Sequence, residues 1–171
     1  MSVPSTGHDG PFPAVHVTPT TTVPADWIDY NGHMNVAYYT MAIDQAIDHL
    51  LETALGVGES FVAETRMGPY ALQSHIAYLG ELLEGDAFFT EILLIDSDPK
   101  RLHLMILLKR ASDGALSATC EQLLMNVDLT TRRSAAYPDW AQARMRAMTS
   151  AHAETPRPDQ LGQPLGIRRK G

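Results

Sequence analysis

The longest apolar pattern in the chain has the period of an α-helix. Between residues 36 and 54, apolar side chains recur at intervals of three and four, and polar residues fall on the opposite face, as in an amphipathic helix. The apolar positions are Val36, Tyr39, Ile43, Ala46, Ile47, Leu50, Leu51 and Ala54. Asn35 stands where an N-cap belongs, and Gly56 stands where a C′ glycine belongs. The predicted helix is roughly 30 Å long, which is enough to cross a sheet.

Segments with the pattern of β-strands flank this helix. Before it, residues 15–23 alternate and are rich in Val and Thr. After it, four strand-like segments follow at residues 69–79, 86–95, 101–109 and 115–129. The pair Asp113-Gly114 favours a tight hairpin between the last two. One strand, a long helix and then four antiparallel strands predict an α+β fold with a sheet of about five strands.

Two of these strands are apolar on both sides of the pleat, at residues 86–95 and 101–109. One side can pack on the helix, so the other needs a different cover. A second subunit is the simplest cover, which predicts a homodimer or homotetramer. The amphipathic stretch at residues 140–148 is an alternative source of part of it.

Length and composition indicate one domain with free ends. A chain of 171 residues suits a single core. Residues 1–13 and 151–171 are rich in proline and glycine, and we expect both to be disordered tails around a domain at residues 14–150 that includes a C-terminal helix. No apolar run is long enough to cross a membrane, and residues 1–13 do not resemble a secretory signal. The single cysteine, Cys120, suits a reducing compartment, so we expect a cytoplasmic protein without a membrane partner.

Charge bears on the partners of the protein. The net charge of −7 argues against a nucleic-acid partner, because binding to a phosphate backbone needs a basic face. Three basic pairs remain as local sites for an anion, unless they are only solvated residues at turns: Lys100-Arg101, Lys109-Arg110 and Arg132-Arg133. We expect Lys100 and Arg101 to contact the substrate.

A cluster of reactive residue types precedes the helix. Asp29 is a carboxylate that can serve as a nucleophile or as a general base. Gly32 lets the backbone approach a ligand closely. The helix start offers unpaired N–H groups that can hold an oxyanion. Asp29 and Asn35 are also ordinary turn and capping residues, so the spacing alone leaves both interpretations open.

A family resemblance favours the chemical interpretation. The run Asp29-x-x-Gly32-His33-x-Asn35, followed by two tyrosines and a long helix, resembles the 4-hydroxybenzoyl-CoA thioesterase-like group of hot dog proteins, over about residues 15–137. The resemblance implies a hot dog fold, in which an antiparallel sheet wraps a long central helix. It implies that Asp29 is the catalytic carboxylate, that the backbone N–H of Asn35 or Val36 holds the oxyanion, and that the active sites lie between two subunits.

A narrower resemblance concerns the acyl group. Residues 26–39, 100–104 and 127–129 are similar to the betainyl-CoA thioesterases of bacterial carnitine catabolism. The implied reaction is hydrolysis of betainyl-CoA to glycine betaine and coenzyme A. Coenzyme A is then part of the substrate, and no separate cofactor is expected.

Other residues are weaker candidates for the site. His33 is a candidate to orient Asp29 or a water molecule, and His75 and Glu121 are titratable groups on predicted strands that can line a pocket. Trp27 and Tyr30, with Tyr78, can form an aromatic cage for a trimethylammonium group, although core packing is the commoner role for such residues. The seven histidines show no metal-ligand spacing, and no metal is predicted.

Two other classes of function share this fold. A hot dog dehydratase normally presents a catalytic histidine, whereas the Asp29 motif fits hydrolysis better. A thioesterase for another short or aromatic acyl-CoA and a non-catalytic acyl-CoA-binding protein also remain open, because a fold does not determine a function.

Overall fold

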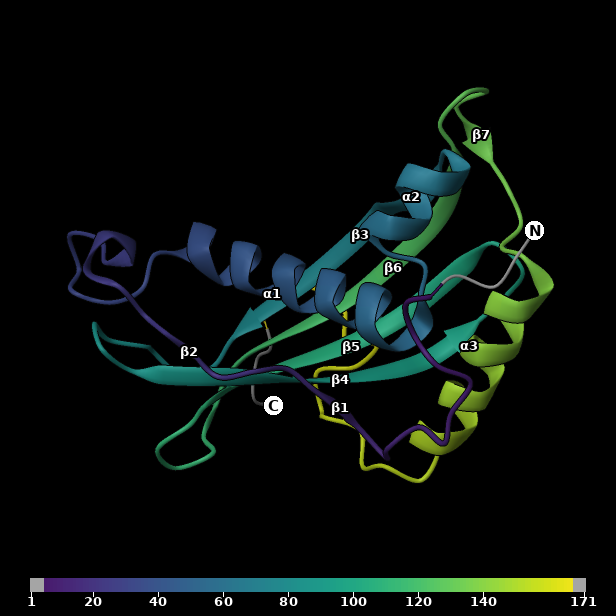
Figure 1. Ribbon diagram of the computed structural model, residues 1–171. Coiled ribbons are helices and arrows are strands. Elements are labelled where there is room, and N and C mark those ends of the chain that lie inside the picture. Colours follow the sequence, from purple (N-terminus) through teal and green to yellow (C-terminus); the bar gives the residue numbers. More distant parts are fainter. Residues whose placement is uncertain (1–4, 168–171) are drawn as a thin grey trace.

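A long helix lies across one face of an antiparallel sheet in the computed structural model, which describes residues 5–167 (Figure 1). Helix α1 spans Val36–Leu50, and Asn35 caps it by accepting a hydrogen bond from the Ala37 N–H. The α-helix is shorter than predicted, because its last turn widens into a π-helical segment, η2, at Leu51–Leu55. Gly56 ends the segment in the left-handed conformation that glycine adopts readily, with φ of 71°.

The sheet contains the four predicted strands after the helix. They are β3 (Met67–Tyr78), β4 (Ala87–Ser97), β5 (Arg101–Arg110) and β6 (Leu116–Asp128), each within two residues of its predicted ends. The order across the sheet is β1-β4-β5-β6-β3, and the neighbouring strands run antiparallel. Among the described residues, strand β3 therefore pairs only with β6, and its other edge is open.

The prediction of one strand at residues 15–23 was wrong. The segment forms two short pieces on β4, which are β1 (His16–Val17) and β2 (Thr21–Thr22). Pro19 lies between them, and a proline has no N–H to continue the ladder of hydrogen bonds.

Four further short or peripheral elements complete the described structure. Helix α2 (Glu59–Thr65), the 3-10 turn η1 (Ala25–Trp27) and strand β7 (Arg133–Ser134), which pairs with β6, were not predicted. Helix α3 (Asp139–His152) contains the predicted amphipathic stretch. Its buried residues join the same core cluster as α1, so α3 does not provide the cover expected for the outer face of the sheet.

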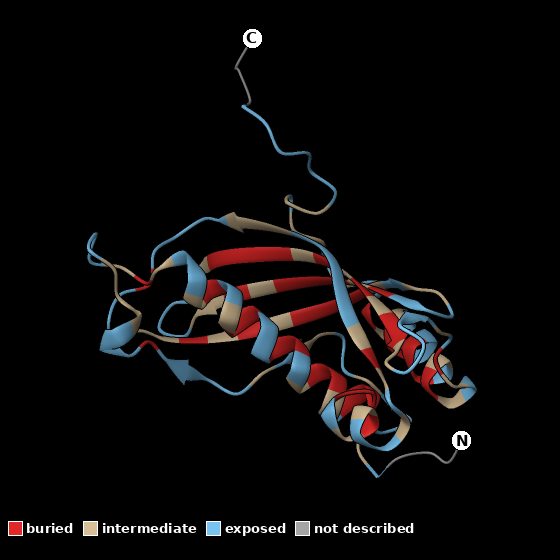
Figure 2. Ribbon diagram, turned by 90° about the horizontal axis from the view of Figure 1, so that it is seen from above, coloured by how far each residue is buried: buried red, intermediate tan, exposed pale blue. Residues whose placement is uncertain are grey.

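The core lies between α1 and the inner face of the sheet (Figure 2). One cluster joins the second half of α1 to the middle strands through residues such as Ile47, Leu94 and Leu104, all of which are at most 2% exposed. A second cluster underlies the first half of α1 and includes Met34 and Tyr39. This packing fixes the start of α1 relative to the loop that precedes it.

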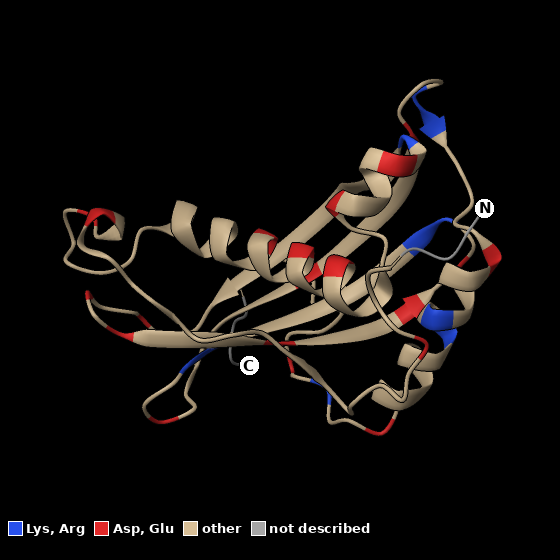
Figure 3. Cartoon of the chain, viewed as in Figure 1, with Lys and Arg blue, Asp and Glu red and all other residues tan. Residues whose placement is uncertain are grey.

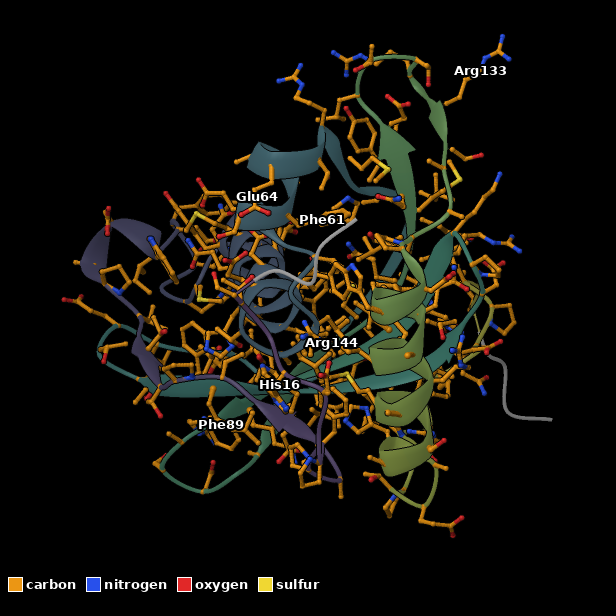
Figure 4. The ribbon with its side chains drawn as sticks, turned by 45° about the vertical axis from the view of Figure 1, so that its right-hand side comes forward. His16, Phe61, Glu64, Phe89, Arg133 and Arg144 are labelled. Carbon is orange, nitrogen blue, oxygen red and sulfur yellow. The ribbon has the colours of Figure 1, made fainter. Side chains whose placement is uncertain are left out.

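Parts of both expected tails contact the domain. The Arg144 side chain, only 4% exposed, donates hydrogen bonds to the Thr6 carbonyl, the Leu55 carbonyl and the Asp9 carboxylate (Figure 4). At the other end, the Gly162 N–H donates to the Glu121 carboxylate on the outer face of the sheet. The domain as described therefore extends on both sides of the predicted limits, residues 14 and 150.

Candidate functional site

The loop before α1 is held in a fixed shape by its backbone. The Asp29 N–H donates to the His33 carbonyl, and the Gly32 N–H donates back to the Asp29 carbonyl, each at 3.0 Å. Gly32 has φ of 82°, which is the left-handed conformation that makes glycine suitable at this turn. The Met34 N–H donates to the Leu82 carbonyl, and the fully buried Met34 side chain anchors the loop in the core.

The Asp29 carboxylate is placed for reaction at the rim of this loop. One oxygen, Oδ1, accepts a hydrogen bond of 2.8 Å from the Asn31 N–H. The other oxygen, Oδ2, has no hydrogen-bond partner within residues 5–167. The side chain is half-buried, so Asp29 is both oriented by the loop and accessible to a ligand.

The start of α1, seven residues after Asp29, presents an unpaired backbone donor. The Ala37 N–H donates to the Asn35 side chain, and the Tyr38 N–H donates to the Asn35 carbonyl. The Asn35 N–H is itself engaged, because it donates to the Trp27 carbonyl at 2.9 Å. The Val36 N–H has no partner in the described part of the chain, and it carries the partial positive charge of a helix N-terminus. Of the two oxyanion donors implied by the resemblance, Val36 is therefore the one with a free N–H.

His33 does not approach Asp29 through its ring. Its Nδ1 lies 3.2 Å from the Met34 carbonyl, which is a contact with the neighbouring backbone. Among the described residues no hydrogen bond joins the His33 ring to the Asp29 carboxylate. This geometry supports a structural role more than a direct one.

The aromatic residues near the loop are mostly packed against one another. Trp27 stacks on Tyr38 with ring centroids 5.1 Å apart and also contacts Phe88. Tyr78 meets Tyr39 edge to face at 5.4 Å and is 49% exposed, while Tyr30 is 95% exposed. Trp27 thus has one ring face stacked on Tyr38, whereas Tyr30 and Tyr78 are exposed aromatics of this region.

A separate cavity of about 720 Å³ lies on the outer face of the sheet. Its lining includes His75, Glu121 and Arg101, but none of Asp29, His33, Asn35 or Val36. The predicted site residues therefore fall into two groups within one chain. Glu121 is bonded on both carboxylate oxygens, to the His103 ring at 2.8 Å and to the Gly162 N–H at 2.7 Å. Sequence reasoning did not single out His103, because the register that brings it near Glu121 forms only in the folded sheet.

Lys100 and Arg101 lie at the end of the sheet opposite the Asp29 loop (Figure 1). Arg101 forms an ion pair with Asp98 in the turn between β4 and β5, and this pair lowers the pKa of the Asp98 carboxyl. The Lys100 ammonium donates to the Ser134 hydroxyl at 3.2 Å. Neither residue reaches the Asp29 loop of its own chain.

Two absences within residues 5–167 bear on other kinds of site. No group of three or more His, Cys, Asp or Glu within residues 5–167 is arranged to hold a metal ion. No helix in the same range is long and apolar enough to cross a membrane.

Comparison with known proteins gives consistent matches. Residues 23–145 match the family model of the Thioesterase-like superfamily. A betainyl-CoA thioesterase of Pseudomonas aeruginosa is 31% identical over 153 residues, which cover 90% of this chain and 96% of the relative. An L-carnitine dehydrogenase/betainyl-CoA thioesterase of Rhizobium meliloti is 34% identical over 87% of this chain. The chain spans only 30% of the length of that second relative.

Solved structures agree with these matches. A hypothetical protein of Staphylococcus aureus, determined in complex with CoA, superposes with a TM-score of 0.81 at 29% identity and covers 90% of this chain and 96% of its own. A putative thioesterase of Pseudomonas putida superposes with a TM-score of 0.77, also at 29% identity, over 91% of this chain and 98% of its own. The hot dog fold predicted from the sequence is confirmed.

Proposed function

Because the chain belongs to the Thioesterase-like superfamily, we propose that it hydrolyses an acyl-CoA thioester to the free acid and coenzyme A, with Asp29 as the catalytic carboxylate. One observation carries this proposal. The open Oδ2 of Asp29 and the free N–H of Val36, the first residue of α1, belong to one short segment that Met34 anchors in the core. A carboxylate and an oxyanion donor are the two groups that acyl transfer to water requires.

The chemistry follows from these two groups. The Asp29 carboxylate either attacks the thioester carbonyl, which gives an anhydride that water then cleaves, or removes a proton from the water that attacks. In both routes the carbonyl oxygen becomes negative and accepts a hydrogen bond from the Val36 N–H. The C–S bond then breaks, coenzyme A leaves as a thiolate that takes up a proton, and the acid is released. The tight loop matters because a donor is effective only when it is held ready for the charge that develops.

The open edge of β3 supports a second subunit next to this site. Exposed apolar side chains lie along or near this edge: Tyr70, Leu72, Tyr78, Leu79 and Leu83, each 44–49% exposed. An unpaired strand with such residues is a template for pairing with another chain. Antiparallel pairing of two β3 strands around a two-fold axis would cover this row and close the exposed side of the Asp29 loop. We therefore include a homodimer, with sites between its subunits, in the proposal.

The relatives and the local charge favour betainyl-CoA as the substrate. The compared relatives are named for a betainyl-CoA thioesterase. Asp26 and Asp29 lie close in the sequence, in a protein of net charge −7, which suits an acyl group that carries a quaternary ammonium. Because Trp27 is packed against Tyr38, recognition of the cation would rest on Tyr30, Tyr78 and these carboxylates. A cytoplasmic location goes with this substrate and with the buried thiol of Cys120, whose pKa burial raises to about 12.

A panel of acyl-CoA esters, assayed by the release of free thiol, tests the proposal. Betainyl-CoA should give the highest kcat/KM, ahead of acetyl-CoA, straight-chain esters and benzoyl-CoA. Preference for another ester would exclude betainyl-CoA as the preferred substrate, but the assignment as a thioesterase would stand. Hydrolysis of none of them, by a protein that still binds CoA esters in calorimetry, would identify a non-catalytic binding protein instead.

A further inference from the structure

The Tyr39 hydroxyl is buried and makes two hydrogen bonds to one backbone segment. Tyr39 lies in the first turn of α1 and is 4% exposed. Its hydroxyl donates to the Gly80 carbonyl at 3.2 Å and accepts from the Leu82 N–H at 3.1 Å. A phenol can act as donor and acceptor at once, and here both functions are used. Tyr39 therefore ties α1 to the segment at residues 79–86, which joins β3 to β4.

The two backbone groups bound by this hydroxyl are held in different ways. Gly80 is fixed to the sheet, because its N–H donates to the Ser117 carbonyl near the start of β6 at 3.0 Å. Leu82 holds the Asp29 loop instead, because its carbonyl accepts the 2.8 Å hydrogen bond from the Met34 N–H. The hydroxyl thus links a point on the sheet to the point that holds the loop.

The place of the Asp29 loop depends on this segment. Outside α1, the backbone hydrogen bonds that leave residues 23–35 in the described chain all end on residues 79–86. Two of them are at Val23 and one is at Met34, and each is 2.8 or 2.9 Å long. The hydrogen bonds within the loop fix its shape, but only these three fix its position. A shift of residues 79–86 relative to α1 would therefore move the loop.

Ion pairs do not hold the two segments together. Residues 1–65 contain no lysine or arginine, and residues 79–86 contain none either. Both segments carry acids: Asp26, Asp29, Glu81, Glu84 and Asp86. Figure 3 shows acidic residues in the loop before α1 and in the turn between β3 and β4. Arg110 on β5 offsets their repulsion only in part, because its ion pair is with Asp113. The contact therefore depends on core packing and on neutral hydrogen bonds.

The hydroxyl also keeps the proton that it donates. Burial raises the pKa of Tyr39, the hydrogen bond from the Leu82 N–H offsets part of this rise, and Glu81 adds to it. The phenol is therefore protonated at neutral pH, and its hydrogen bond to the Gly80 carbonyl is retained.

We propose that Tyr39 is a positioning residue for hydrolysis, whose hydroxyl holds the Asp29 loop in place relative to the first turn of α1. This inference rests on the proposed function for the roles of Asp29 and of the Val36 N–H in that turn. Tyr39 acts through Leu82 and Met34 and does not touch the substrate, because both functions of its hydroxyl are occupied by backbone groups.

The variant Tyr39→Phe tests the proposal, because it removes the hydroxyl and keeps the ring. The edge-to-face contact with Tyr78 and the place of the ring in the core remain, so the variant should fold. Its kcat on the best acyl-CoA substrate should fall about 10- to 100-fold, because a misplacement of about 1 Å can lower a rate about 100-fold. Its KM should stay within about threefold of wild type, since no contact with the substrate is lost.

The variant Tyr137→Phe is the matched control. The Tyr137 hydroxyl is also buried, but it has no hydrogen-bond partner within residues 5–167, and its ring lies in the other core cluster. Both kcat and KM of this variant should stay within about twofold of wild type. The three proteins are compared well below their unfolding midpoints, so that loss of folded enzyme does not lower kcat.

Amide hydrogen exchange, followed by NMR, measures the restraint without catalysis. In Tyr39→Phe the Leu82 and Met34 N–H groups should exchange about tenfold faster than in wild type, because one hydrogen bond less shifts the opening equilibrium by about this factor. The Ile106 N–H in the middle of the sheet should be unchanged, and Tyr137→Phe should change none of the three. Faster exchange in a protein that hydrolyses no ester would support the link and refute only the proposed function.

Wild type alone gives a second readout, which stands even if Tyr39→Phe does not fold. The Leu82 and Met34 N–H groups should open together, with protection factors within about threefold of each other. Protection of Met34 more than about tenfold below that of Leu82 would overturn the link between them.

Three further results would overturn the inference. One is a kcat of Tyr39→Phe within about twofold of wild type. Another is an equal loss of kcat in Tyr137→Phe, which would indicate a general effect on the core. The third is a rise in KM at unchanged kcat, which would assign Tyr39 to substrate binding.

Discussion

The buried histidine at the end of α3 predicts a loss of stability in mild acid. His152 is fully buried, and its Nδ1 accepts a hydrogen bond of 2.8 Å from the Leu94 N–H on β4. An Nδ1 that accepts must be unprotonated. Adding a proton there would place two donors face to face and break the link between α3 and the sheet. Burial, and then the nearby Arg157 charge, lowers the pKa of His152 to about 4.

The size and the pH range of the effect follow from this pKa. The folded protein keeps His152 neutral down to about pH 4, whereas the unfolded chain binds a proton near pH 6.5. The contribution of neutral His152 to the stability of the folded protein is therefore fully present above about pH 6.5 and is lost as the pH falls toward 4. Between pH 7 and pH 5 the loss is about 2 kcal/mol in the free energy of unfolding. His16, whose pKa is also lowered to about 4 by burial and by His49, adds a smaller loss because it is partly exposed.

The variant His152→Asn isolates this contribution. Its side-chain oxygen can accept from the Leu94 N–H, but it does not titrate. The variant should be less stable than wild type at pH 7, because it is smaller, and the difference should shrink by about 2 kcal/mol at pH 5. Urea unfolding of both proteins at the two pH values measures it. If the free energy of unfolding depends equally on pH in the two proteins, His152 is not the group whose protonation destabilises the fold.

Three predictions concern the site itself. Val36→Pro removes the proposed oxyanion donor at the first helical position, where proline is tolerated. It should lower kcat about 100- to 1,000-fold, whereas the control variant Val36→Ala should lower kcat less than about threefold. Equal activity of the two variants would exclude this donor. Leu72→Asp places like charges across the proposed two-fold axis and should convert the dimer into an inactive monomer in light scattering; an active monomer would exclude the shared site. Betainyl-CoA should exceed its uncharged isostere 3,3-dimethylbutyryl-CoA by about 10- to 100-fold in kcat/KM, after correction for alkaline hydrolysis, and a ratio near one would exclude recognition of the charge.

The elements were readable from the sequence wherever one periodic pattern decided them. The helix from Val36 and the four long strands follow from spacing alone, because each buries one regular face. The short strands β1 and β2 were misread as one, since the alternation continues through Pro19 although the backbone pairing does not. Strand β7 is too short to leave a pattern.

A candidate site could be proposed from the sequence only where its residues are close together in the chain. Asp29, Gly32, Asn35 and Val36 are neighbours in the sequence, and their loop could be recognised as a unit. His75 and Glu121 were correctly placed on strands, but which face they occupy depends on registers and bulges formed in the sheet. The contact of residues 5–13 with Arg144 is also invisible in the sequence, because it joins segments more than 130 residues apart.

The role of Asp29 is tested most directly by the turnover of Asp29→Asn. The substitution keeps the shape of the side chain and an oxygen that can accept from the Asn31 N–H, so the loop and the fold should survive, as circular dichroism and the unfolding midpoint would show. It removes the negative charge that attacks the thioester or activates water. We expect a fall in kcat of at least about 100-fold on the best acyl-CoA substrate. A folded variant that keeps more than about a tenth of the wild-type rate would contradict it.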